Sequence, residues 1–345
     1  MSAILIDGRE FVAGRRTGIG RFLEGLLLAV HEAHPEWRLT VAMTKACALP
    51  SSLDSKATVL YLPHLPELWW PRLANGYDLF LSPYPKLPWQ RLSCPAVHTV
   101  HDVLYLTHPA YRGNTLRVLA GRLRLKRALQ LASLTWFDSA ASLEACNELA
   151  GIRHGEVRFP AIAASFTPGA GETAEPYFLY VGNGLPHKNV PLLLKVIGQL
   201  PAKLALVGVR GGDGLIANLD AATGAKVVCP DSVTDSELLT LYRDAAALLL
   251  PSTAEGFGYP PLEAMACGTP AIVADIPVLR ETTGGAAMRC DPHDEGAWRQ
   301  AMASMLQPET RAEWAEKGRR WVAPLLAPHG WTAHVADLER LLERR

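Results

Sequence analysis

The sequence predicts an α/β protein built from two parallel-sheet domains, and three observations lead to this prediction. The chain has 345 residues, which is long enough for two ordinary domains with a sizeable core each. Short apolar runs alternate with longer stretches whose apolar residues recur at helical spacing, and this series occurs twice. Between the two series lies a stretch rich in Pro, Ala, Gly and Ser, which we interpret as an interdomain linker at residues 161–176.

The first domain is expected at residues 1–160. It opens with the apolar run AILID, continues through a loop of glycine and arginine, and then shows helical spacing at 20–33. A second helical stretch at 115–132 precedes a strand whose last residue, Ser139, can cap the next helix. The strands of this domain are expected at 3–7, 38–43, 78–83, 95–102 and 134–139.

The second domain is expected at residues 177–322. A helix is predicted from about Val190 to Leu200, and Thr234 with Glu237 has the spacing of a capping box at the start of another. The strands are expected at 177–182, 203–208, 225–230, 247–252 and 270–275. Because ligands of parallel sheets bind beyond the carboxyl ends of the strands, the loops after these strands are expected to line a cleft between the domains.

Composition and charge predict a soluble globular protein of the cytoplasm. Lys plus Arg equals Asp plus Glu at 34 each, so no nucleic-acid partner is expected, although the net charge is +5 over residues 1–160 and −5 over the rest. The six cysteines are scattered and typical of reduced thiols, and the N-terminus does not resemble a signal peptide. No apolar run approaches the ~20 residues that span a bilayer, which leaves open a peripheral contact with the inner face of the membrane.

The most informative stretch is EGFGYPPLE, where Glu255 and Glu263 stand eight positions apart around a glycine loop and a Pro-Pro pair. Glycines let the backbone approach a ligand, and a helix that starts at the prolines presents free N–H groups to an anion. Carboxylates at the two ends are suited to accept hydrogen bonds from hydroxyls. Such a site fits a nucleotide sugar, with ribose near one acid and the sugar near the other. The alternative is that Glu263 is only first-turn helix charge and Glu255 a surface acid.

The stretch EGFGYPPLEAMACGTPAIVAD is similar to the E-x7-E signature of the retaining GT4-type glycosyltransferases of the GT-B fold. The segments TGIGRFLEGLL, HTVHDVLYLTHP and YVGNGLPHKNVPLLLKVI also resemble that family. The resemblance implies two Rossmann-like domains facing across a cleft. Residues 1–160 would form the acceptor side and residues 177–322 the nucleotide-sugar side, and the amphipathic tail at 323–345 would pack back on the N-terminal domain.

The resemblance also implies roles for the matching residues. Glu255 would bind hydroxyls of the transferred sugar, and Glu263 would hold the ribose. Lys188 would neutralise the leaving diphosphate, and His101 would stand near the sugar and the attacking hydroxyl. The remaining donor contacts would come from the backbone amides of Gly256, Phe257 and Gly258 and from Gly18 and Gly20, which would close over the diphosphate.

One position departs from the family pattern. Many relatives have an arginine where this chain has Asn183, and a neutral residue there removes a cation from the leaving-group site. Arg210 in the neighbouring loop, or another residue, is expected to compensate.

No metal or other cofactor is expected besides the nucleotide sugar as co-substrate. The chain has no Asp-x-Asp motif, and the Asp-x-Glu at 235–237 is explained by the capping box. His98 and His101 are three apart on a strand and therefore point to opposite faces. The glycine loop at 18–20 lacks the G-x-G-x-x-G spacing of dinucleotide sites, because the next glycine is Gly25.

We therefore expect a metal-independent, retaining hexosyltransferase that uses a glycan or lipid-linked acceptor. GDP-mannose is the favoured donor because the PHKN segment resembles that of bacterial surface-polysaccharide mannosyltransferases, and UDP-sugars remain an alternative. The tryptophans at 65–74 and the basic helix at 115–132 suggest a membrane surface, although core tryptophans and a solvated helix with its charges spread around it explain them equally well. A sugar-nucleotide epimerase and a non-catalytic binding protein are the alternative functions.

Overall fold

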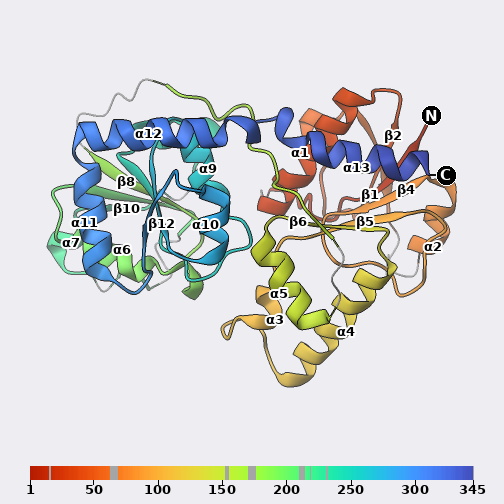
Figure 1. Cartoon of the computed structure of the whole chain (residues 1–345), viewed down its shortest axis with the longest axis horizontal. Coiled ribbons are helices and arrows are strands. Elements are labelled where there is room, and N and C mark those ends of the chain that lie inside the picture. The colour runs from red at the N-terminus through yellow and green to blue at the C-terminus, as the bar shows by residue number, and fades with distance from the viewer. Residues whose placement is uncertain are drawn as a thin grey trace. The chain divides into compact units, whose positions relative to one another are not determined.

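The structure is a computed structural model that describes residues 1–14, 17–62, 69–151, 155–169, 176–209, 214–217, 219–230 and 232–344 (Figure 1). The chain divides into two compact units. The first unit comprises Met1–Ala161 and Ala327–Arg345, and the second comprises Ile162–Leu326. Each unit contains one parallel sheet, so the expectation of two Rossmann-like parallel-sheet domains is confirmed.

The first unit is built on a sheet of seven parallel strands in the order β3-β2-β1-β4-β5-β6-β7. Every residue of β1, β4 and β5 is buried, as expected for central strands that are covered on both faces. The strands are β1 (Ala3–Asp7), β2 (Arg38–Met43), β3 (Ala57–Tyr61), β4 (Leu79–Ser82), β5 (Ala96–Val100), β6 (Leu134–Phe137) and β7 (Glu156–Val157).

Six helices accompany this sheet in the part of the chain that the structure describes. Helix α1 begins where the Thr17 hydroxyl accepts a hydrogen bond from Gly20 N at 2.9 Å, so this threonine is the N-cap. Gly25 lets α1 pack closely on the C-terminal segment, because a Cβ there would lie 3.0 Å from a ring carbon of Trp331. The helices are α1 (Gly18–Ala33), α2 (Trp70–Leu73), α3 (Leu104–Thr107), α4 (Thr115–Leu131), α5 (Ala140–Ala150) and α13 (Thr332–Glu343).

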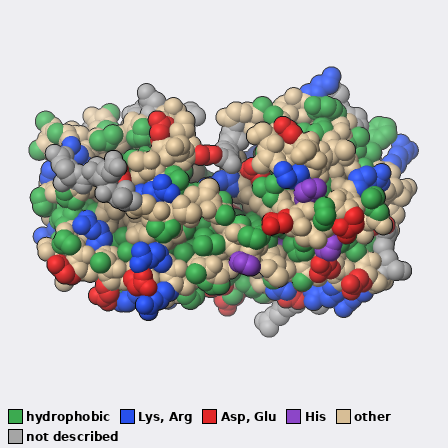
Figure 2. All heavy atoms as spheres, turned by 90° about the horizontal axis from the view of Figure 1, so that it is seen from above, with side chains coloured by type: hydrophobic (Ala, Val, Ile, Leu, Met, Phe, Trp, Pro, Cys, Tyr) green, Lys and Arg blue, Asp and Glu red, His purple; other side chains and the backbone are tan. Residues whose placement is uncertain are grey.

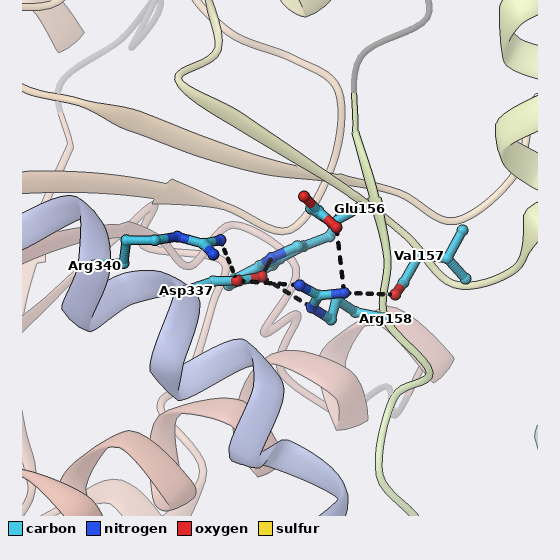
Figure 3. A network of polar contacts seen from close by, with 6 residues as sticks. Glu156, Val157, Arg158, Asp337 and Arg340 are labelled. Carbon is cyan, nitrogen blue, oxygen red and sulfur yellow. Dashed lines mark hydrogen bonds and ion pairs between the residues drawn. The ribbon is translucent and has the colours of Figure 1, made fainter.

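A buried carboxylate fastens the C-terminal helix α13 to the first unit (Figure 3). Asp337 is 2% exposed and accepts hydrogen bonds from Trp136 Nε1 at 2.9 Å and from Arg158 Nε at 3.0 Å. Arg340, one turn further along α13, donates to the other oxygen of Asp337 at 2.5 Å. Since Trp136 lies in β6 and Arg158 directly follows β7, one side chain joins the end of the chain to two neighbouring strands of the sheet.

The second unit has six parallel strands in the order β10-β9-β8-β11-β12-β13. Its strands are β8 (Tyr177–Val181), β9 (Lys203–Val207), β10 (Val227–Val228), β11 (Ala247–Leu250), β12 (Ala271–Ala274) and β13 (Met288–Cys290). Its helices are α6 (Val190–Ile197), α7 (Ala221–Gly224), α8 (Asp235–Asp244), α9 (Tyr259–Ala266), α10 (Pro277–Thr283), α11 (Glu295–Met305) and α12 (Pro308–Val322). The strand order runs outward in both directions from the β8/β11 pair, which is therefore the topological switch point.

Several local predictions can be compared with this structure. The capping box is confirmed, since Thr234 accepts from Glu237 N and the Glu237 carboxylate accepts from Thr234 N. The strand predicted at 225–230 is reduced to two residues. The stretch interpreted as a linker belongs to the second unit from Ile162 onward, where the Arg243 guanidinium donates to the Thr167 carbonyl at 2.8 Å. None of the helices in the described part of the chain combines the length and apolar character that a membrane span requires.

Replacing Asp337 with asparagine should destabilise the first unit, because Arg158 and Arg340, which are partly exposed, would lose their carboxylate partner. Losing a hydrogen-bond partner that carries charge typically costs about 1.5–3 kcal/mol. The measurement is the free energy of unfolding in urea, followed by tryptophan fluorescence. Glu343→Gln at the exposed end of the same helix is the control and should change stability by less than about 0.5 kcal/mol. Equal stability of the two variants would show that the Asp337 contacts do not hold α13.

Candidate active site

The loops after β8 and β11 meet at the switch point of the second unit and carry two of the residues singled out in the sequence. Lys188 ends the short turn at Pro186–Lys188 after β8, and Glu255 lies in the loop after β11. Lys188 Nζ donates to Glu255 Oε1 at 2.6 Å, and the two side chains are only 17% and 9% exposed. The structure thus joins the two residues that the sequence treated separately, as one partly buried ion pair.

Hydrogen bonds to backbone carbonyls hold these two loops against each other. The His187 carbonyl accepts from Thr253 N at 2.8 Å and from the Thr253 hydroxyl at 3.2 Å. Asn189 has a left-handed backbone with φ of 53°, and its side-chain amide donates to the carbonyls of Pro251 and Pro292 at 3.3 and 2.8 Å. Asn189 therefore ties the loops after β8, β11 and β13 together and fixes the position of Lys188 beside it.

The glycine loop leads into α9 as predicted. Gly258 is the residue before the helix and has φ of 86°, and a Cβ there would lie 2.7 Å from a methyl carbon of Leu279. A glycine is therefore required at this position for both conformation and space. No side chain caps the N-terminus of α9. The helix ends at Gly268, also left-handed, where Thr269 N and Gly268 N return to the carbonyls of Ala264 and Met265 in a Schellman motif.

Neither acid of the signature is an exposed charge, so the alternative of a surface acid and a first-turn helix charge is wrong. Glu263 is the fifth residue of α9, is 2% exposed, and accepts a hydrogen bond from Tyr242 Oη at 2.6 Å. Tyr242 comes from α8, so the tyrosine hydroxyl fixes Glu263 between two helices. Phe257 in the intervening loop is buried, with its ring edge-on to Tyr259 at 5.1 Å.

The position that departs from the family pattern is exposed. The Asn183 side chain accepts from Leu185 N at 3.3 Å, and its carbonyl accepts from Tyr180 Oη at 2.7 Å, so it shapes the turn before Lys188. Arg210, which was expected to compensate for the missing cation, lies outside the described residues.

His101 of the first unit follows β5 and faces two hydrogen-bond acceptors. Its Nδ1 lies 2.6 Å from Asp138 Oδ2 and its Nε2 lies 2.8 Å from the Pro83 carbonyl. Only an imidazolium can donate to both. Burial by itself lowers the pKa of His101, but the nearby charge and hydrogen bond of Asp138, with Asp102 and the Pro83 carbonyl, outweigh it and raise the pKa above its ordinary value of 6.5.

Asp138 was missed in the sequence, although a signal for it was present. Val100 pairs with Phe137 in the parallel ladder of β5 and β6, so the next residue of each strand falls side by side. A polar residue directly after each of two neighbouring strands therefore predicts this contact. Asn189 and Tyr242 were also missed, and no spacing rule in the sequence identifies them.

A cavity of about 780 Å³ opens beside His101 within the first unit. Four aromatic rings line it, and three basic side chains reach it. Ile19, which lies between the predicted site glycines Gly18 and Gly20 at the start of α1, also contributes to its wall. The aromatic residues are Tyr84, Trp89, Tyr105 and Tyr111, and the basic ones are Lys86, Arg117 and Arg124.

The predicted site residues thus fall into two groups. Gly18, Gly20 and His101 belong to the first unit, and the residues from Asn183 to Glu263 belong to the second. Among the described residues, no group of three or more His, Cys, Asp and Glu side chains is arranged to hold a metal ion.

Replacing Asp138 with asparagine should lower the pKa of His101, because the carboxylate is the main group that favours the charged ring. Since the folded-state pKa is raised, the stabilisation is complete below the unfolded value and is lost as pH rises through the folded value. The parent protein should therefore lose more stability than the variant when the pH rises above 6.5. The His101 ring signal in NMR, assigned with His101→Gln, reports the pKa, and the exposed Asp54→Asn is the control. An unchanged His101 pKa would contradict the assigned cause.

Comparison with known proteins places this geometry in a family context. Residues 165–321 match the family model of the glycosyl transferases group 1, which covers the second unit from Ser165 to Trp321. The O-antigen chain mannosyltransferase RfbU of Salmonella typhimurium is 39% identical over 138 residues, which are 39% of each chain. The O-antigen chain mannosyltransferase B of Escherichia coli is 34% identical over 149 residues, 41% of this chain and 38% of that one. The matched region therefore spans about two fifths of the length of these relatives.

A longer alignment and the solved structures extend the similarity to the first unit. The D-inositol 3-phosphate glycosyltransferase of Gordonia bronchialis is 28% identical over 308 residues, 77% of this chain and 67% of that one. Sucrose-phosphate synthase from Thermosynechococcus elongatus aligns with a TM-score of 0.77 at 19% identity, covering 100% of this chain and 99% of that one. HepE of Anabaena, solved with UDP-glucose, aligns with a TM-score of 0.77 at 16% identity, covering 99% and 100%.

These structural alignments show the fold, which is that of the GT-B glycosyltransferases. They agree with the E-x7-E resemblance and with the two parallel sheets. Residues 165–321 are thus similar to the glycosyl transferases group 1, and the chain as a whole has the fold of the GT-B glycosyltransferases.

Proposed function

We propose that the chain is a retaining, metal-independent glycosyltransferase that moves a hexose from a nucleoside diphosphate sugar to a hydroxyl of a glycan or lipid-linked glycan. The observation that carries the proposal is the 2.6 Å contact between Lys188 and Glu255 at the switch point of the second unit. A cation for a leaving phosphate and an acid for a sugar hydroxyl are adjacent there. In our proposal, the bond between sugar and phosphate lies beside this pair.

Lys188 and Glu255 can contact the phosphate and the sugar, respectively, while their own ion pair stays intact. The ammonium group of Lys188 has three donors, so it can keep Glu255 and still donate to a phosphate oxygen. The carboxylate of Glu255 has two oxygens, so it can accept from a sugar hydroxyl while held by the lysine. The N-terminus of α9, with no side-chain cap, adds backbone dipole at the same loop. Preorganised donors of this kind contribute about 2.7–4 kcal/mol each to the stabilisation of a developing charge.

The contacts of His101 indicate a role different from that of a base. Both ring nitrogens face acceptors, and the raised pKa favours the charged ring, so no lone pair is available to take a proton from an attacking hydroxyl. In our proposal His101 is a fixed positive charge at the wall of the cavity. The cavity beside it, with its aromatic rings, is assigned to the acceptor, because rings stack well on sugars and on apolar chains.

The names of the relatives support mannose as the hexose. Two of the most similar relatives are named as O-antigen mannosyltransferases, at 39% and 34% identity over their matched regions, which favours GDP-mannose as the donor. HepE shares the fold and was solved with UDP-glucose, so UDP-sugars remain the second donor class to test.

Substitutions of the two acids of the signature should have different effects on ligand binding. Glu263→Gln should weaken the nucleoside diphosphate and the nucleotide sugar alike, because both carry the ribose, by roughly 10- to 150-fold. Glutamine keeps an acceptor for the Tyr242 hydroxyl, so this substitution avoids leaving a buried donor unpaired. Glu255→Gln should leave diphosphate binding intact or tighter, because Lys188 loses its counter-charge, while it weakens the intact donor and lowers turnover.

Isothermal titration calorimetry with GDP, UDP and the corresponding sugar nucleotides measures both effects, and turnover is measured with and without acceptor. Tyr242→Phe serves as the matched control for Glu263, since it removes the hydroxyl but keeps the acid. If Glu255→Gln loses diphosphate affinity while Glu263→Gln keeps it, the two roles are reversed. Consumption of donor in the absence of any acceptor would instead favour an epimerase.

A further inference from the structure

Helix α4 of the first unit is apolar on two opposite faces. Leu125, Ala128 and Leu129 are buried against the unit. On the other side, Leu116, Leu119 and Leu123 are 76%, 54% and 55% exposed. Their spacing of three and four residues puts the three leucines on one stripe of the helix surface. A helix with one face in the core ordinarily turns polar residues outward, so this exposed leucine stripe requires a separate explanation.

Basic side chains flank the leucine stripe on both sides. At 100° per residue, Arg122 and Lys126 fall on one side of it and Arg117 and Arg124 on the other. Helix α4 contains five Lys and Arg residues and no Asp or Glu, and no carboxylate among the described residues pairs with these four. In the sequence, the spread of basic residues around this helix fitted a solvated helix equally well. In the structure, the same spread places positive charge along both edges of the leucine stripe.

Other parts of the surface are organised differently. Figure 2 shows a face of the molecule on which basic and acidic side chains are interspersed. On α12, Lys317 pairs with Glu313 and Arg320 with Glu316, each at 2.7 Å. Helix α12 thus pairs its basic side chains with acids, whereas α4 has no acids of its own.

Two exposed aromatic side chains accompany α4. Trp89 is 60% exposed, and its carbonyl accepts from the Arg127 guanidinium of α4 at 2.9 and 3.2 Å. Tyr105 on α3 is 44% exposed and lies next to Gly121 of α4, where an added Cβ would come within 3.9 Å of its ring. Tryptophan and tyrosine are the residues that favour the boundary between lipid headgroups and acyl chains.

We propose that the outward face of α4, defined by Leu116, Leu119, Leu123 and the flanking basic residues, docks the protein on an anionic lipid bilayer. The leucines would enter the headgroup region while the arginines and lysine contact anionic headgroups, the arrangement of an interfacial helix. A second copy of the same face is a poor occupant, because it would oppose positive charge with positive charge. This proposal places on α4 the peripheral membrane contact that the sequence left open.

The position of α4 also connects docking to the acceptor. Arg117, Leu123 and Arg124 line the cavity beside His101, so the helix that contacts the bilayer is a wall of that cavity. An acceptor with a lipid tail and a polar head can then keep its tail in the bilayer while its head enters the cavity. This part of the inference rests on the proposed function, whereas docking itself does not depend on it.

The test is flotation of the full chain with vesicles of phosphatidylcholine alone and of phosphatidylcholine with phosphatidylglycerol, without nucleotide or sugar. We expect binding to the anionic vesicles only, weakening as salt is added. Arg122→Gln with Lys126→Gln should weaken binding about 25-fold, roughly fivefold per residue. Leu119→Glu with Leu123→Glu should abolish it. Val228→Glu and Arg299→Gln are the matched controls, because both are exposed in the second unit, and they should bind like the parent chain.

Circular dichroism melts of all variants check that folding is unchanged, as expected for exposed positions. Absence of binding by the parent chain at low salt would overturn the proposal, as would equal loss in the α4 variants and the controls. A concentration-dependent dimer that the leucine variants abolish, without vesicle binding, would assign the face to a second copy instead. The flotation assay contains no donor, so its result does not depend on glycosyl transfer. A failure of membrane docking can therefore be distinguished from a failure of the proposed function.

Discussion

The contact between Lys188 and Glu255 is the interaction on which the interpretation of the second unit depends. It exists because two loops that lie 67 residues apart in the chain emerge from neighbouring strands, β8 and β11, at the switch point of a parallel sheet. The side-chain amide of Asn189 and the backbone carbonyl of His187 hold these loops together. The pair is therefore set by the sheet topology, and both charges are partly buried without either being left alone.

In the first unit, His101 is also held in place by residues that lie far apart in the sequence. Its ring contacts Phe22 of α1 at 5.0 Å, and Phe22 in turn contacts Trp331 and His334 near the C-terminus. Asp337, one turn after His334, anchors that segment to β6 and to the residue after β7. The end of the chain thus supports the helix that packs against His101, which explains why a residue so far along the sequence belongs to the first unit.

Much of the fold follows from the sequence because the buried strands are short apolar runs that end in polar loops. The signature glycines, the start of α9 and its end at Gly268 were predictable from the conformations that glycine and proline favour. The edge strands β3, β7 and β13 were not, since β7 and β13 have only two or three residues and β3 is half exposed. Some partners of the site residues were also hidden. Asn189 and Tyr242 act through loop and helix contacts that no local spacing reveals, whereas Asp138 could have been found from the pairing of the two strands that end before it and His101.

The central claim is that Lys188 and Glu255 act as one unit on the bond between sugar and phosphate. The most direct measurement is a double-mutant cycle on kcat/KM with Lys188→Met, Glu255→Gln and the double variant, using GDP-mannose and a lipid-linked acceptor. The account predicts that each single change lowers kcat/KM by roughly 100- to 1,000-fold. The double change should cost far less than the product of the two, because each removes the other's partner. Independent, multiplicative losses, or no loss in either single variant, would contradict it.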